Sequence, residues 1–444
     1  MKAATNEKAI EQLAPPAVVV IPMSMHFGAP CTPLVKAGDH VKVGQKIGEF
    51  HGLGAPIHAS VSGTVKAVEP RPYSMGGNIT SVVIENDMQD EVSEEVQAPA
   101  HPNALSVEEM VEIVKNAGIV GMGGATFPTH VKITSGIGKV NTVIINGAEC
   151  EPYITGDHRT MLERPEEIIG GAKFLAKMFG VDKVVIGVED NKRNGIDAMN
   201  KVIAEQKAPV VVEPLRCRYP QGGEKQLCQA ITGRQVPPGG LPADIGCAVF
   251  NINTTCAIYR ALTTGMPVVR KIVTVSGSGV VEPKNLECPI GTPVSSLLDA
   301  CGGLKDGTYK LIAGGPMMGM AQYTADISVA KGTGAILAFC ENEEKTVENP
   351  QCIRCGKCVS VCPMHLEPLF MYQYASKGMV EELNDAHIMD CMECGACSYI
   401  CPARMHLTHM FKTGKQLVKD KAAADRAAAE AKKKAEEAKE AAAK

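Results

Sequence analysis

The sequence lacks the features that would place the protein inside a membrane, outside the cell or on a nucleic acid. No apolar run approaches the roughly 18 residues of a membrane-spanning helix, and "AVVVIPM" at 17–23 is about the longest. The first 20 residues are polar and contain no apolar core of an export signal. A formal net charge of -4 gives no basic excess for binding nucleic acid. We therefore expect a soluble protein, or one held at a membrane by partner proteins.

Cysteine, by contrast, is abundant, and its spacing indicates a function. The chain contains 17 cysteines, which would suggest disulfides in a secreted protein, but no export signal accompanies them. Eight of them form two runs of identical spacing, "CIRCGKCVSVCP" at 352–363 and "CMECGACSYICP" at 391–402. Metal binding in a reducing cytosol is therefore the better explanation. The other nine cysteines have no ligand spacing, and we expect most of them to be buried as small apolar side chains.

Both runs follow the pattern C-x2-C-x2-C-x3-C-P, in which three cysteines bind one 4Fe-4S cluster and the fourth binds a second cluster. One cluster is therefore predicted on Cys352, Cys355, Cys358 and Cys401. The other is predicted on Cys391, Cys394, Cys397 and Cys362. The competing interpretation is two zinc knuckles, although zinc gains nothing from duplicated spacing. Residues 366–390 predict two short helices broken at Gly378, as in a helical two-cluster ferredoxin that passes single electrons.

Strand and helix patterns alternate in the middle of the chain. Valine- and isoleucine-rich segments at 140–145, 182–188 and 208–215 predict strands, and the spacing at 165–179 and 192–206 predicts helices. This order is typical of an α/β domain with a parallel sheet. At 444 residues the chain is long enough for two to four domains, so we expect a multidomain α/β protein.

Polar residues and glycines follow the predicted strands, where α/β sheets bind their ligands. Asn146, Glu149 and Glu151 follow the first strand, and Gly222, Gly223 and Glu224 follow the last. The glycines would let the backbone approach a ligand. The alternative, that these acids are solvated or cap helices, stays open for each of them.

A glycine-rich loop, "GIVGMGGATFPTHVKI" at 118–133, resembles a nucleotide-binding loop but departs from the dinucleotide fingerprint. Thr126 stands where a third small residue belongs, and the preceding segment is a predicted helix with Ser106 as its N-cap. The loop therefore follows a helix and not a strand. A phosphate-binding loop and a simple turn between two helices both remain possible.

Four motifs in order resemble the flavin- and NADH-binding subunit of respiratory complex I: "GMGGATFPTHVK", "NGAECEP", "YPQGGE" and "FNINTTCA". With its flanking segments, the chain over residues 20–410 resembles the C subunits (RnfC) of the Rnf complex, a membrane-bound, ion-pumping ferredoxin:NAD oxidoreductase. The resemblance implies FMN, two 4Fe-4S clusters and NAD(H) as substrate. It implies partners among the other Rnf subunits, notably the iron–sulfur protein RnfB and the membrane subunits, with ferredoxin reached indirectly. It implies a peripheral position on the cytoplasmic side of the cell membrane.

Residue roles follow from the same resemblance. A glycine scaffold and a lysine would hold the FMN phosphate and ribityl chain: Gly121, Gly123, Gly124 and Lys132. Two polar side chains would face the isoalloxazine ring: Asn146 and Glu151. The flavin and nicotinamide would be lined by Tyr219, Gly222, Gly223 and Glu224. Asn251 and Thr255 would close over the phosphate, and Phe127 would stack on the adenine end of NAD(H). Glu151 and Glu224 are thus the candidate catalytic residues.

The sequence departs from the complex I pattern at three positions. Met122 replaces a usual arginine, Ala148 an acid and Ile133 an aromatic residue. These changes keep the glycines but alter contacts to NAD. Two alternative functions are a soluble flavo-iron–sulfur reductase similar to the cobalamin reductases, and an electron relay or scaffold without catalytic activity.

The flanking segments complete the predicted domain organisation. Residues 34–69 resemble the barrel-sandwich hybrid of biotinyl and lipoyl carriers, but no lysine lies between Lys46 and Lys66 at the hairpin tip, so a carrier function is excluded. Residues 271–319 resemble a β-grasp module of the soluble-ligand-binding (SLBB) type. The predicted domains are an N-terminal tail (1–25), a barrel-sandwich hybrid (26–98), a Rossmann-like FMN/NAD domain (99–268), the β-grasp module with a linker (269–345), a dicluster ferredoxin domain (346–410) and an Ala/Lys/Glu-rich helical tail (411–444).

Overall fold

The computed structural model describes residues 1–340 and 347–442, with side chains up to residue 434. The chain divides into two compact units, residues 1–344 and 345–444, which we call the large unit and the cluster unit. The predicted boundary between the β-grasp module and the ferredoxin domain, at 345/346, lies outside the described residues.

A small barrel of antiparallel strands begins the large unit. Its two sheets have the orders β2-β8-β7-β4 and β3-β5-β6. The strand bounds are β2 (Val18–Pro22), β3 (Thr32–Pro33), β4 (His40–Val41), β5 (Lys46–Glu49), β6 (Ile57–His58), β7 (Gly63–Pro72) and β8 (Asn78–Asn86). Val19, Ile21 and Ile47 are fully buried, because alternate residues of each strand point into the barrel. Strand β2, within the predicted N-terminal tail, pairs with β8 and so belongs to this barrel.

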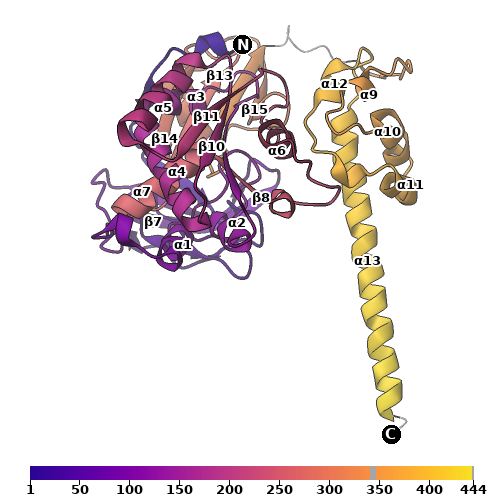
Figure 1. The fold of residues 1–444 in the computed structure, drawn as a ribbon, viewed down its shortest axis with the longest axis horizontal. Coiled ribbons are helices and arrows are strands. Elements are labelled where there is room, and N and C mark those ends of the chain that lie inside the picture. The colour runs from indigo at the N-terminus through magenta and orange to yellow at the C-terminus, as the bar shows by residue number, and fades with distance from the viewer. Residues whose placement is uncertain (341–346, 443–444) are drawn as a thin grey trace. The chain divides into compact units, whose positions relative to one another are not determined.

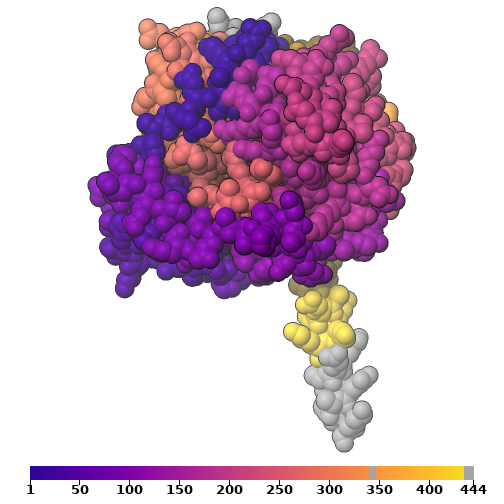
Figure 2. Space-filling view, turned by 60° about the vertical axis from the view of Figure 1, so that its left-hand side comes forward, coloured from indigo at the N-terminus to yellow at the C-terminus, as the bar shows by residue number. Residues whose placement is uncertain are grey.

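The first residues of the chain join a distant part of the large unit. After the short helix η1 (Lys2–Ala4), strand β1 (Ile10–Gln12) pairs in parallel with β14, where Ile10 lies opposite Asn285. Figure 2 shows these first residues in indigo between the orange β-grasp residues and the magenta α/β domain. The segment predicted as a tail is therefore an integral part of the fold.

The central α/β domain contains a parallel sheet of order β11-β10-β9-β12, as the alternating pattern predicted. Its strands are β9 (Thr142–Gly147), β10 (Val184–Glu189), β11 (Val210–Leu215) and β12 (Cys247–Asn251). Its helices are α1 (Val107–Asn116), α2 (Thr129–Gly136), α3 (Gly156–Glu163), α4 (Pro165–Phe179), α5 (Arg193–Gln206), α6 (Glu224–Thr232) and α7 (Ile252–Thr264). Figure 1 shows α5 and α6 on opposite sides of β10 and β11. The sheet is therefore covered on both faces.

Successive residues of β9 explain this two-sided packing. Val143 and Ile145 join the apolar cluster that includes α4, whereas Ile144 joins the cluster beneath α6 with Leu227. Helices α4 and α7 pack closely at Gly171. A Cβ at this position would lie 2.2 Å from a carbonyl oxygen of α7. A glycine is required at this crossing.

The β-grasp module forms the last part of the large unit. Its sheet has the order β1-β14-β13-β17-β15-β16, with β1 as the contribution of the N-terminal segment. The bounds are β13 (Arg270–Ser276), β14 (Lys284–Pro289), α8 (Val294–Ala300), β15 (Thr308–Ala313), β16 (Met320–Gln322) and β17 (Ala335–Cys340). Strands around a single helix agree with the β-grasp prediction for 271–319.

The cluster unit is helical. It contains α9 (Lys357–Ser360), α10 (Pro368–Ser376), α11 (Val380–Asp385), α12 (Ala396–Ile400) and the long α13 (Leu407–Ala442), which extends beyond the other helices in Figure 1. The predicted break at Gly378 is confirmed, because this glycine has a φ of 66° between α10 and α11. Helix α13 runs through the predicted tail, and its Glu430 and Lys434 are exposed.

Candidate flavin and iron–sulfur sites

The glycine loop connects α1 to α2 and closes on itself. The N–H of Gly121 donates to the carbonyl of Phe127 at 2.9 Å, so the residues between them form a short closed loop. Gly124 has a φ of 147°, and a Cβ there would point into open space. Gly123 lies against Asn251, whose amide nitrogen would be 3.2 Å from an added Cβ. The loop is therefore closed by its own backbone, and its exposed glycines Gly123 and Gly124 carry no side chain where a phosphate would approach.

Asn146 and Asn251 lie side by side at the carboxyl edge of the sheet, in register at the ends of β9 and β12. The Asn146 amide donates to the Gly222 carbonyl at 2.8 Å, which fixes the loop before α6. Asn251 caps α7 and donates to Asp157 at 2.8 Å. Residues from four motifs thus converge on the edge where parallel sheets bind ligands.

Two charged side chains beside the glycine loop lie outside the predicted motifs: Lys271 is buried, and Asp157 is half-buried and accepts hydrogen bonds from Asn251 and Asn253. Burial and, to a smaller extent, nearby Glu149 raise the pKa of Asp157 to about 6, although Lys271 and the two asparagine amides act to lower this pKa. Burial lowers the pKa of Lys271 to about 8. The Lys271 ammonium donates to the carbonyl of Met122 at 3.2 Å, which ties the β-grasp module to the glycine loop. Asp157 lies five residues beyond the "NGAECEP" motif, and only the fold brings it to Asn251 and Asn253.

The two neighbouring threonines of α7 have different roles. Thr255, predicted to close over the phosphate, is fully buried and donates to the Asn251 carbonyl at 3.0 Å within its own helix. Thr254 instead accepts a hydrogen bond from the Met122 N–H at 2.9 Å and donates to Val120. Thr254 is therefore the threonine that holds the glycine loop, and the sequence spacing did not distinguish the two.

Lys132 and Glu224 form an ion pair in this structure. The Lys132 ammonium lies 2.9 Å from a Glu224 carboxylate oxygen and 3.0 Å from the Val249 carbonyl. Glu224 is the first residue of α6, with Gly223 as its N-cap, and Tyr219 precedes a cis proline in the same loop. Both charged side chains are partly exposed. A lysine next to the glycine loop and an acid at the helix start are therefore held together at one point.

Glu151 points toward the β-grasp module. Its carboxylate accepts hydrogen bonds from the N–H groups of Met317 and Met318, at 3.2 and 2.9 Å. Gly315 leaves room for this carboxylate, because a Cβ would lie 2.3 Å from it and the Glu151 side chain would have to move. Burial raises the pKa of Glu151, whereas the two N–H groups lower it. The predicted catalytic acid is thus positioned by a loop of another domain.

The three departures from the complex I pattern all lie in the interior. Met122, Ile133 and Ala148 are buried. Met122 contacts the rest of the site through its backbone, by the bonds to Thr254 and Lys271 described above. The departures therefore change packing and leave the backbone of the loop in place.

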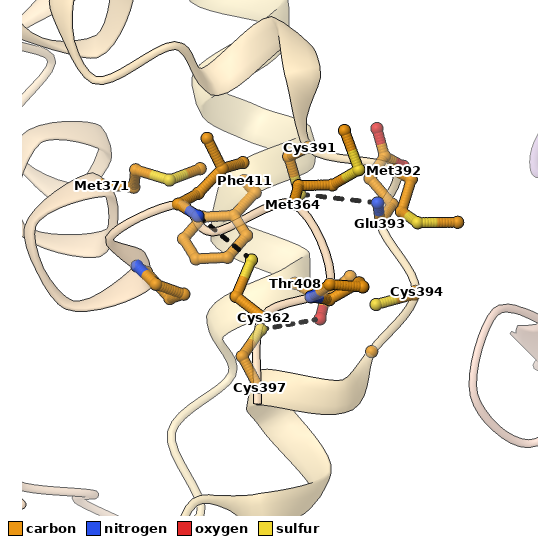
Figure 3. A pocket seen from close by; sticks show the side chains of 14 residues that line it. Cys362, Met364, Met371, Cys391, Met392, Glu393, Cys394, Cys397, Thr408 and Phe411 are labelled. Carbon is orange, nitrogen blue, oxygen red and sulfur yellow. Dashed lines mark hydrogen bonds between the residues drawn. The ribbon is translucent and has the colours of Figure 1, made fainter. Parts of the chain in front are cut away.

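In the cluster unit, the eight cysteines gather in two groups. Cys362 lines one cavity with Cys391, Cys394 and Cys397 of the other run, as Figure 3 shows. Cys401 lines a second cavity with Cys352, Cys355 and Cys358. Each group takes three cysteines from one run and the fourth from the other, which is the grouping that the spacing predicts.

The two runs share one backbone conformation. Arg354 and Glu393, two residues after the first cysteine of each run, have φ values of 54° and 56°. Their N–H groups each donate to that cysteine's sulfur at 3.4 Å. Such N–H···S bonds stabilise a thiolate ligand. Among the described residues, no three His, Cys, Asp or Glu side chains converge closely enough to hold a single metal ion. Each group supplies four thiols, one for each iron of a 4Fe-4S cluster, so the residues fit two such clusters.

Comparison with known proteins agrees with this division of the chain. Residues 1–89 match the RnfC barrel-sandwich hybrid domain, 114–260 the Nuo51 FMN-binding domain, 272–321 the SLBB domain and 344–402 the 4Fe-4S dicluster domain. The described helices include none that is both long and apolar enough to span a bilayer. These matches define an iron–sulfur protein with an FMN-binding domain.

Two curated relatives cover most of the chain. The C subunit of the Na⁺-translocating ferredoxin:NAD⁺ oxidoreductase complex of Acetobacterium woodii is 46% identical over 377 residues, 84% of this chain and 85% of that protein. The C subunit of the proton-translocating complex of Clostridium ljungdahlii is 43% identical over 385 residues, 86% of this chain and 84% of that protein. The chain belongs to the family of C subunits of ion-translocating ferredoxin:NAD⁺ oxidoreductase complexes.

A solved structure shares the fold at low identity. An NAD⁺-reducing [NiFe]-hydrogenase in its H2-reduced state superposes with a TM-score of 0.51 and 19% identity, over 70% of this chain and 63% of that one. This likeness supports the fold alone.

Proposed function

We propose that the protein is the NAD(H)-linked electron-transfer subunit of a membrane-bound complex that couples electron flow between ferredoxin and NAD to the translocation of Na⁺ or H⁺. The main supporting observation is that one chain combines the glycine loop, closed by a backbone hydrogen bond, with two groups of four cysteines. Each group takes three cysteines from one run and the fourth from the other. The names of the relatives with 46% and 43% identity support the same activity. The large unit would exchange electron pairs with a nucleotide, and the cluster unit would pass single electrons.

The proposed flavin site is built on the glycine loop. FMN, when bound, would accept two electrons from NADH and release them singly. The exposed backbone at Gly123 and Gly124 would receive the phosphate, and the Lys132 ammonium would supply a countercharge. Glu224, paired with Lys132 at 2.9 Å, would orient the nicotinamide beside the flavin. Asn146 would fix the loop at Gly222 against the rings.

The cluster unit would carry electrons onward. Each group of four cysteines would hold one 4Fe-4S cluster, with ligands crossed between the runs. The partners would be other subunits of the complex, notably an iron–sulfur subunit and membrane subunits. The protein would then lie peripherally on the cytoplasmic side of the cell membrane, attached through those subunits.

Anaerobic purification followed by NADH addition tests this proposal. We expect about eight irons and acid-labile sulfides per chain, from two clusters of four, and FMN retained or restored by added FMN. NADH should bleach the flavin and then reduce the clusters, as followed by absorbance and electron paramagnetic resonance. Two zinc ions in place of iron would refute the electron-transfer function. Full clusters without any NADH-dependent reduction would leave only an electron relay.

A further inference from the structure

The barrel module sends one aromatic ring to the glycine loop. Phe27 lies between β2 and β3, and its N–H donates to the carbonyl of Thr126 at 3.0 Å. Its ring is 59% exposed and lies 6.0 Å, between centroids, from the ring of Phe127. A single exposed phenylalanine would mean little. Here, however, the ring extends an aromatic surface that begins on the loop itself.

The backbone under Phe27 is held from both sides. Gly28 has a φ of 128°, and a Cβ there would collide with the Leu53 carbonyl at 2.0 Å. The preceding His26 is buried, with a ring nitrogen 3.3 Å from the Cys31 sulfur. The loop therefore has little freedom to withdraw the ring. Such a fixed, solvent-facing aromatic ring is preorganised for a planar ligand.

The other side of the loop is braced by the β-grasp module. A Cβ on Gly332 would lie 2.5 Å from the methyl carbon of Thr126, so the threonine side chain packs directly on this glycine. Thr126, with a φ of 49°, is thus fixed between Phe27 and Gly332. The position of the two rings is set by three modules that are far apart in sequence.

We propose that Phe27 is a binding residue for the adenine base of NAD(H), contributed by the barrel module. This inference rests on the proposed function. A base inserted between two rings needs about 7 Å, twice the roughly 3.5 Å of a carbon–carbon contact. The two rings are 6.0 Å apart and tilted by 35°, so the base stacks on the exposed face of the pair and not between its members. The barrel module thereby takes part in selecting the nucleotide.

The test compares NADH with reduced nicotinamide mononucleotide, which keeps the reacting ring and lacks the adenylate. The full chain, loaded with FMN and clusters, is assayed with ferricyanide as acceptor. For Phe27→Ala we expect the KM for NADH to rise roughly tenfold, since stacking on a base has about this value. The kcat, the FMN content and the KM for the mononucleotide should stay unchanged. Phe27→Tyr should retain the low KM because it keeps the ring.

Leu34→Ala is the matched control, because Leu34 is a 51% exposed apolar residue of the same barrel. An unchanged KM for NADH in Phe27→Ala would overturn the inference. An equal rise for both substrates would also overturn it, since that would mean general damage to the site. If the wild-type protein does not oxidise NADH at all, the proposed function itself fails, which is a different result.

Discussion

Both units place cysteines in their apolar cores, but only in the cluster unit are these cysteines predicted metal ligands. In the large unit, six of the nine cysteines outside the runs are buried as small apolar side chains in a core that valine, isoleucine and leucine dominate. In the cluster unit, Cys397 is itself a member of the apolar core, and Cys358, Cys391 and Cys401 pack against it. The remaining core of that unit is small, and Ile353, Tyr399 and Phe370 stay exposed.

This difference indicates how each unit depends on its ligands. A small domain with a limited core needs metals or disulfides to be stable. The cluster unit places its predicted ligands where a core should be, so cluster binding and folding should be one process. The large unit has an extended core of its own, and its flavin site is built on a fold that is already complete.

Removing iron should have the largest effect, and it should be confined to one unit. After anaerobic chelation of the full chain, we expect residues 347–420 to lose most of their amide protection in hydrogen-exchange mass spectrometry. Residues 1–340 should keep theirs, because their core contains no predicted cluster ligand. A cluster unit that keeps its protection without iron would show that its apolar core is sufficient, and the comparison would fail.

Single cysteine variants should separate the two clusters. Cys362→Ala should disturb the same cluster as Cys391→Ala, because both side chains line one cavity. Cys401→Ala should resemble Cys352→Ala. Each variant should lose roughly half of the iron and one set of electron paramagnetic resonance signals. Cys217→Ala, an exposed cysteine of the large unit, is the control and should retain both.

Spectra that pair Cys362 with Cys352 would contradict crossed ligation.

The grouping of the cysteines could be predicted from the sequence because the run spacing places each fourth cysteine after a short helix that leads it away from the first three. The parallel strands and the break at Gly378 were also predictable, since they depend on local periodicity and on glycine.

Contacts between distant segments could not be predicted in the same way. Lys132 and Glu224 carry separate predicted roles, and only the adjacent positions of α2 and α6 show that they are paired. The polar segment before residue 13 has no clear strand pattern, because β1 covers only three residues and gains its stability from β14. Thr254 and Thr255 differ only in the helix face that they occupy. Periodicity indicates burial, whereas the identity of the partner is set by the fold.

Lys132→Ala should weaken FMN binding while the large unit remains folded. A charge-assisted contact to phosphate contributes about 1.5–3 kcal/mol, which corresponds to roughly tenfold to a hundredfold in affinity. FMN stoichiometry should fall, and excess FMN should restore turnover in part. Glu224→Ala should keep FMN but lower NADH-to-ferricyanide turnover. Lys115→Ala removes a comparable exposed ion pair of α1 and should change neither. Full FMN and full turnover in Lys132→Ala would mean that the loop is only a turn.

The smallest effect concerns a buried lysine of the large unit. Lys331 donates to the carbonyls of Pro56 and Gly118, both at 2.7 Å, and burial lowers its pKa from 10.5 to about 7. The unfolded chain therefore binds more protons between pH 7 and 10.5, so stability should rise with pH in that window. The gain is at most about 1.4 kcal/mol per pH unit.

Thermal unfolding of the large unit at pH 7 and pH 8 measures this effect. The melting temperature should increase by a few degrees, and Lys331→Met should show a smaller increase because its side chain does not titrate. Lys271 and Asp157 are present in both proteins, so their titration cancels in the comparison. Equal slopes in the two proteins would show that Lys331 keeps its proton in the fold.

The pairing of β1 with β14 constrains the order in which the protein can be completed. Ile10 leaves the ribosome before the barrel strands, yet its partner Asn285 emerges only after the barrel and the α/β domain have been synthesised. The barrel can close earlier, because β2 pairs with β8 within the first 86 residues. Strand β1 is thus made before the barrel but can be placed only after it. Until then, an edge of the β-grasp sheet stays open, and the Lys2 ammonium has not yet reached the carbonyl of Ile154.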